Sequence, residues 1–190
     1  MSIIDDHSRS LKDFKSMGIP VFAPYISEKP MKIGSGDFIV RSFDLTTLDG
    51  RWTHTNADGS ECPCYGFLIT HPEMGKMLYI TDTELIKWRF KGINHILLGT
   101  NYDKDLVNVD NKSKANHVFR GHLSIDTACE FVKANYSDSL QNVIMCHLSS
   151  ENADRDSFIE KMKKVAKNAN VDVAVAGKSW DLKNPSECPF

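Results

Sequence analysis

The second half of the chain alternates apolar runs with amphipathic segments, and this alternation limits its possible folds most strongly. Residues 142–146 form an apolar run typical of a buried strand, and residues 171–176 indicate a final strand. Apolar residues at helical spacing predict helices from Ser124 to Asn135 and from Asp154 to Asn168, each beginning at a capping residue. Strands that alternate with helices form sheets covered by helices, so the sequence predicts an α/β sandwich.

The first half is typical of strands joined by turns. Near the N-terminus, residues 8–17 predict a short helix that ends at Gly18, and residues 19–23 predict a brief strand. Further apolar or alternating runs predict strands at residues 37–45, 65–70, 76–81 and 95–98. A polar loop spans residues 46–60, and residues 71–75 predict a hairpin turn.

Size and composition exclude several classes of protein. A chain of 190 residues is long enough for one domain with a sizeable core, and its net charge of −2 gives no bulk attraction to nucleic acid, although a local basic cleft stays possible. No apolar run reaches the roughly 20 residues that span a bilayer. Five cysteines, an odd number, favour reduced thiols and a cytoplasmic setting.

Residue types that bind metals stand at or near the ends of the apolar runs. Asp82 follows residues 76–81, His147 follows residues 142–146, and His54 lies in the polar loop. Asp6-His7 precedes the first predicted helix. Each of these, taken alone, also fits a turn, a helix cap, a surface loop or a structural histidine. Together, imidazole and carboxylate groups from several strand ends are typical of a zinc-type site with one position open for water.

Four segments resemble the metallo-β-lactamase superfamily. Asp6-His7 resembles the end of its His-x-His-x-Asp-His signature, whose first two histidines would fall on Ser2 and Ile4. Thr81-Asp82-Thr83, the run from His147 to Asn152, and His54 ahead of the strand at 65–70 match segments that carry metal ligands in that family.

The resemblance implies a single metallo-β-lactamase-type αββα sandwich over residues 1–190, with the family's first strands, roughly 50–60 residues, missing at the N-terminus. It also implies one or two Zn²⁺ ions, with Mn²⁺ as an alternative, and Asp82 as the bridging ligand. The implied metal ligands are Asp6, His7, His54, Asp82 and His147.

Gly121-His122-Leu123-Ser124 resembles the phosphodiesterase branch of this superfamily, which includes ribonuclease Z-like enzymes and the anti-Pycsar cyclic-nucleotide phosphodiesterases of phages. The resemblance implies that His122 is the general acid for the leaving oxygen and that Asp6 acts beside the attacking hydroxide. Ser124, at a helix start suited to phosphate, and Asn101, in an Asn-Tyr-Asp segment of small relatives, are expected to contact substrate.

We therefore expect a metal-dependent phosphodiesterase that hydrolyses cyclic nucleotides or nucleic acid through metal-bound hydroxide, as a cytoplasmic homodimer without membrane association. One alternative is a catalytically impaired, truncated paralogue that acts as a binding or dimerisation module. Another is hydrolysis of thioesters or lactams. His71, His95 and His117 match nothing in the family and are not expected to take part in chemistry.

Overall fold

The computed structural model describes residues 11–19, 21, 31–33, 37–56 and 59–183. Its centre is one sheet whose seven strands lie side by side in chain order. The strands are β1 (Met31–Ile33), β2 (Phe38–Asp44), β3 (Tyr65–His71), β4 (Gly75–Ile80), β5 (His95–Gly99), β6 (Asn142–Cys146) and β7 (Asn170–Val173). Strands β1 to β4 pair antiparallel and strands β4 to β7 pair parallel, so the sheet is mixed.

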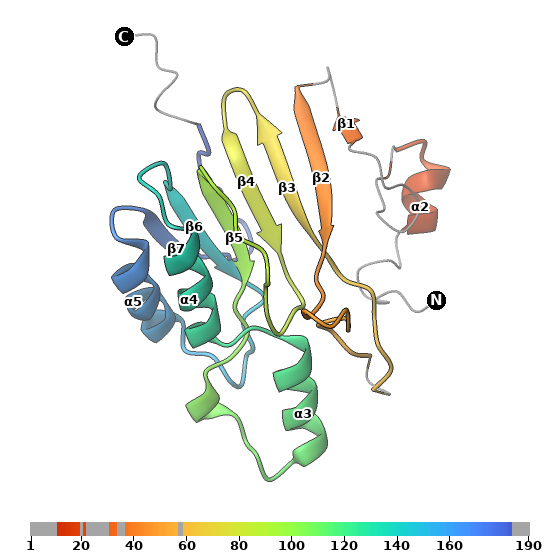
Figure 1. Ribbon diagram of the computed structural model, residues 1–190, viewed down its shortest axis with the longest axis vertical. Coiled ribbons are helices and arrows are strands. Elements are labelled where there is room, and N and C mark those ends of the chain that lie inside the picture. Colours follow the sequence, from red (N-terminus) through yellow and green to blue (C-terminus); the bar gives the residue numbers. More distant parts are fainter. Residues whose placement is uncertain (1–10, 20, 22–30, 34–36, 57–58, 184–190) are drawn as a thin grey trace.

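The described helices are α2 (Leu11–Ser16), the 3-10 helix η1 (Lys104–Leu106), α3 (Lys112–Gly121), α4 (Ile125–Asn135) and α5 (Arg155–Ala166). In Figure 1, α4 and α5 lie against one face of this sheet, α3 lies beyond the strand ends and α2 lies near the β1 edge. The side chains of Asn111, Ser124 and Asp154 accept hydrogen bonds from backbone N–H groups of the first turn and so cap α3, α4 and α5. In the described part of the chain, no helix has the length and apolar character needed to cross a bilayer.

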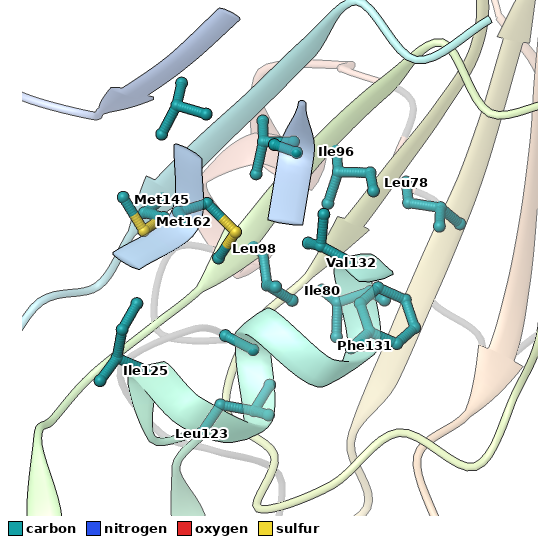
Figure 2. Packing of buried hydrophobic residues seen from close by; sticks show 14 of the residues in the cluster. Leu78, Ile80, Ile96, Leu98, Leu123, Ile125, Phe131, Val132, Met145 and Met162 are labelled. Atoms are coloured by element: carbon teal, nitrogen blue, oxygen red, sulfur yellow. The ribbon is translucent and has the colours of Figure 1, made fainter. Parts of the chain in front are cut away.

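The core lies between the sheet and the pair α4–α5 (Figure 2). Side chains alternate along a strand, so Leu78 and Ile80 of β4 project to the same face as Ile96 and Leu98 of β5. From the helices, Phe131, Val132, Phe158 and Met162 complete this cluster, and all are buried. The opposite face of β4 carries the half-buried Met77 and Tyr79. One face of the sheet therefore anchors both helices and fixes the strand ends beneath them.

The α/β class is confirmed, as are the predicted helices that became α4 and α5 and the strands that became β2 to β6. The last strand ends at Val173 rather than at residue 176, because its one partner, β6, ends at Cys146. Helix α2 is shorter than predicted among the described residues, and Gly18, with φ of 71°, follows it as expected. Ile19 and Val21 are not in a strand, and the rest of the predicted strand at 19–23 lies outside the described residues.

Helix α3 was not predicted. Among its described residues only Ala115, Val118 and Gly121 are buried, so it has too narrow an apolar face to stand out from a polar loop. Two features could have indicated it: the capping residue Asn111 and the spacing of three between Ala115 and Val118.

Removing the Phe158 side chain should destabilise the whole sheet-and-helix unit. Phe158 is fully buried between α5 and the sheet. We expect Phe158→Ala to lower the free energy of unfolding by about 3–5 kcal/mol in urea denaturation, because it leaves a cavity in a close-packed core. Leu48→Ala is the control, since Leu48 is 95% exposed; a loss of equal size in both variants would contradict this account of the core.

Candidate metal centre

Asp82 and His147 stand where parallel strands end. Asp82 follows β4 by two residues and His147 follows β6 directly, and these strands lie on either side of the parallel strand β5. Both residues have left-handed backbones, with φ of 53° and 58°. Such values are uncommon outside glycine and cost on the order of 1–3 kcal/mol, and residues that adopt them cluster at functional sites. Among the described residues only Lys167 shares this feature with them.

One carboxylate oxygen lies close to three imidazole rings. Oδ1 of Asp82 lies 3.1 Å from Nε2 of His147, 3.6 Å from Nδ1 of His122 and 4.0 Å from Nε2 of His54. Asp82 is only 6% exposed. The ring centroid of His122 lies 5.2 Å from that of His147 and 5.6 Å from that of His54. Four segments that are distant in the sequence therefore meet at this oxygen.

The geometry fits a divalent cation. Ligand atoms of His54, Asp82 and His122 all lie within 4.8 Å of one another. Two ligands at about 2.0–2.1 Å from a tetrahedral zinc ion are about 3.3 Å apart, so small movements would bring these atoms onto one ion. Nδ1 of His122 is buried and has no hydrogen-bond partner among the described residues, which is rare for a buried polar atom. The set of nitrogen and oxygen donors is one that zinc prefers.

His122 is neutral in the metal-free protein at pH 7. Burial is the main cause that lowers the pKa of its imidazole to about 4; the carboxylate of Asp82 opposes this shift, and the neighbouring His147, His54 and His117 add to it. The neutral imidazole is the form that binds metals. The same low pKa disfavours the predicted role of His122 as a general acid in the metal-free protein.

The loop that carries His54 is fixed on both sides. The hydroxyl of Thr53 donates to the Leu45 carbonyl at 2.7 Å, and the carbonyl of Thr53 accepts from the backbone N–H of Glu84 at 3.0 Å. The latter bond joins this loop to the segment just after Asp82. On its other side the His54 ring packs against Gly121, where an added Cβ would lie 3.3 Å from Cδ2 of His54. Close packing at Gly121 therefore helps to orient the imidazole.

Asn101 connects the loops of His122 and His147. Its side-chain N–H donates to the carbonyl of His147 at 2.8 Å, and its backbone N–H donates to the carbonyl of Leu123 at 2.9 Å. Its own carbonyl accepts from the N–H of Ser149 at 2.9 Å. These bonds hold the two histidine-bearing loops together beyond β5.

Asp103 extends this connection to α5. Its backbone N–H donates to the carbonyl of Asn152, and its carboxylate forms an ion pair with Lys161 at 2.7 Å, which holds the pKa of Asp103 below its usual value. Lys161 thus contributes to the support of the candidate metal centre.

The structure brings together His54, Asp82 and His147, three of the five predicted metal ligands, and adds His122 to them. Asp6 and His7 lie outside the described residues. Ser124 is 1% exposed and caps α4, and Asn101 supports His147. Contacts of these two residues with substrate stay predictions.

Sequence reasoning missed His117, because no helix was expected around it. Its ring centroid lies 5.7 Å from that of His122 and 6.1 Å from that of His54. His95, in contrast, is buried, and its ring nitrogens lie within hydrogen-bond distance of the Met74 carbonyl and the Asn142 amide.

The described cysteines, four in number, are free thiols, as predicted. Burial and the nearby charge of Asp82 raise the pKa of Cys146, at the end of β6, to about 12. Burial likewise raises the pKa of Cys64 to about 11. Neither thiol is ionised at pH 7 in the metal-free protein, so the site depends on nitrogen and oxygen donors.

No protein-family model matches the chain, and no curated protein sequence matches it. Solved structures do. Unliganded yeast PDE1 superposes with a TM-score of 0.53 at 13% identity, over 83% of this chain and 48% of that one. An isothiocyanate hydrolase from Delia radicum gut bacteria superposes with a TM-score of 0.54 at 11% identity, over 92% of this chain and 66% of that one.

These similarities show the fold. Both proteins are hydrolases of the metallo-β-lactamase fold, and the mixed α/β sheet described above matches them over most of the chain. The predicted fold class is thereby confirmed. The chain spans less than two thirds of the length of either protein.

Zinc binding should depend on Asp82. We expect the purified chain to bind zinc and Asp82→Ala to weaken that binding by roughly 10-fold or more, because the central oxygen of the site is lost. Competition with a chromogenic chelator measures the affinity. Asp138→Ala, which removes an exposed loop carboxylate, is the matched control. Equal zinc affinity in the Asp82 variant and the wild type would contradict the assignment.

His122 should also make the stability of the metal-free protein depend on pH. As the pH falls from about 6.5 toward 4, the unfolded chain gains a proton on His122 that the folded chain does not accept, so the free energy of unfolding falls. This contribution is at most about 1.4 kcal/mol per pH unit, and it levels off below the folded pKa. Urea denaturation at stepped pH should show it in the wild type and in His71→Asn, but not in His122→Asn. Parallel curves for the wild type and His122→Asn would refute it.

Proposed function

We propose that the chain hydrolyses phosphodiesters, namely cyclic nucleotides or nucleic acid, with a divalent cation bound at Asp82. One observation carries the proposal: a buried carboxylate oxygen lies within 4.0 Å of three imidazole nitrogens at the ends of the parallel strands. That arrangement is typical of a metal centre in a hydrolase. Zinc is the first candidate for the ion and manganese the second.

Asp82, His54, His122 and His147 would hold the cation. Bound there, a divalent ion acidifies a water molecule and neutralises charge on a phosphoryl oxygen. The chain's own contribution is to hold the ligands in place through Thr53, Gly121 and Asn101 and to keep His122 neutral. Nδ1 of His122 faces Asp82, so its Nε2 is the atom left for a hydrogen bond to the leaving oxygen.

The fold does not choose the substrate, since yeast PDE1 and the isothiocyanate hydrolase resemble the chain equally. Two features favour a phosphodiester. Gly121-His122-Leu123-Ser124 resembles a phosphodiesterase segment, and its histidine lies in the metal centre. Helix α3 beside it carries Lys112, Lys114 and Arg120 and no acidic residue, which favours an anion.

The test is a substrate panel with the zinc- or manganese-loaded protein: bis(p-nitrophenyl) phosphate, cyclic mononucleotides, single-stranded RNA and phenyl isothiocyanate. We expect hydrolysis of phosphodiesters, loss of activity with a chelator, and a fall in kcat/KM of roughly 100-fold or more for Asp82→Asn, because the ion is lost. Asp138→Asn is the control.

Other outcomes of this panel would favour other functions. Hydrolysis of the isothiocyanate alone would reject the phosphodiester class but keep the metal centre. A metal-loaded protein that hydrolyses none of the four substrates would favour the alternative of an impaired paralogue that only binds ligand.

A further inference from the structure

Helix α3 forms a wall of the metal centre. Its last residue, Gly121, packs against the His54 ring, and His122 follows as the C-cap, with its backbone N–H bonded to the Val118 carbonyl at 3.2 Å. The helix therefore contacts two of the four residues assigned to the ion. It lies beyond the ends of the strands, at the bottom of Figure 1.

His117 lies on the side of α3 that faces this centre. It precedes Gly121 by four residues, so both lie on one face of the helix. Its ring centroid is 5.7 Å from that of His122 and 6.1 Å from that of His54, with ring planes at 87° and 83° to theirs. Yet His117 is exposed and is not among the residues whose ligand atoms converge within 4.8 Å. His117 therefore lies beside the metal centre, on its solvent side, and is not one of the converging ligands.

Cationic side chains flank His117. Lys114 and Arg120 are three residues before and after it, hence its neighbours on the helix surface, and both are exposed. Lys114 forms an ion pair with Glu151, whereas Arg120 forms no ion pair with the described residues. This stripe of Lys114, His117 and Arg120 is suited to an anion that extends outward from the ion.

We propose that His117 contacts the substrate, donating a hydrogen bond to a non-bridging oxygen of the phosphodiester, with Arg120 beside it for the anionic charge. The inference rests on the proposed function and adds to it the wall from which the phosphate is recognised. A neutral imidazole retains one N–H donor, so this contact requires no change in protonation. Exposure leaves the side chain free to turn toward the bound anion.

The experiment compares His117→Ala and His117→Gln with the wild type, all loaded with zinc, and with His71→Ala as the matched control at the β3–β4 turn. We expect His117→Ala to lower kcat/KM for bis(p-nitrophenyl) phosphate, and to raise the inhibition constant of inorganic phosphate, by roughly 10- to 100-fold. Zinc content should stay that of the wild type. His117→Gln, which retains an N–H donor, should recover most of the loss.

Two results would overturn the inference. Loss of zinc from His117→Ala would make His117 a metal ligand, and wild-type values of both kcat/KM and phosphate inhibition would make it a rim residue without a role. Failure of the proposed function is distinct from these, because it shows in the wild type as zinc bound without phosphodiester hydrolysis. In that event, calorimetry measures the affinity of the zinc-loaded wild type and of zinc-loaded His117→Ala for inorganic phosphate. Equal affinities of the two proteins would overturn the proposed role of His117.

Discussion

The carboxylate of Asp82 is the group around which the rest of the site is arranged. A buried charge costs several kcal/mol, roughly, unless opposite charge and hydrogen bonds compensate for it. The imidazole of His122 cannot supply that charge at pH 7, because burial keeps it neutral in the metal-free protein. A divalent cation bound at this oxygen would supply it, and the low dielectric of the buried site would strengthen the attraction. The arrangement of His54, His122 and His147 around Oδ1 is therefore best understood as a set of ligands.

Such a site needs a rigid support, and the structure provides it through backbone hydrogen bonds more than through the sheet itself. The sheet places Asp82 and His147 after the ends of β4 and β6, on either side of β5, but in left-handed conformations that the surroundings must enforce. Thr53 fixes the loop of His54 to the segment after Asp82, and Asn101 joins the loops of His122 and His147. Each ligand is thus held by a polar contact to another ligand's segment, so they move as a unit or not at all.

Much of this could be predicted from the sequence, for identifiable reasons. The helices that became α4 and α5 have a capping residue and a regular apolar stripe, and β6 is apolar from Val143 to Cys146. Asp82 and His147 were found because they stand directly after such runs. The partnership of Asn101 with His147 could not be predicted, since it joins loops that follow different strands and depends on a backbone carbonyl. His117 was missed because α3 buries too little apolar surface to show its periodicity.

The failure to predict α3 and the position of His117 has a physical basis, and this basis concerns how one fold can act on different substrates. The residues of the candidate metal centre are mostly buried, and two of them, Asp82 and His147, follow strands whose sequences are strongly patterned. A substrate-contacting wall, the role proposed for α3, has the opposite requirement: His117, Lys114 and Arg120 face solvent, so α3 is polar and its sequence is weakly constrained by packing. In the proposed function, metal binding and substrate choice would then reside on different elements. Yeast PDE1 and the isothiocyanate hydrolase resemble the chain about equally in fold, and a shared fold leaves the choice of substrate open.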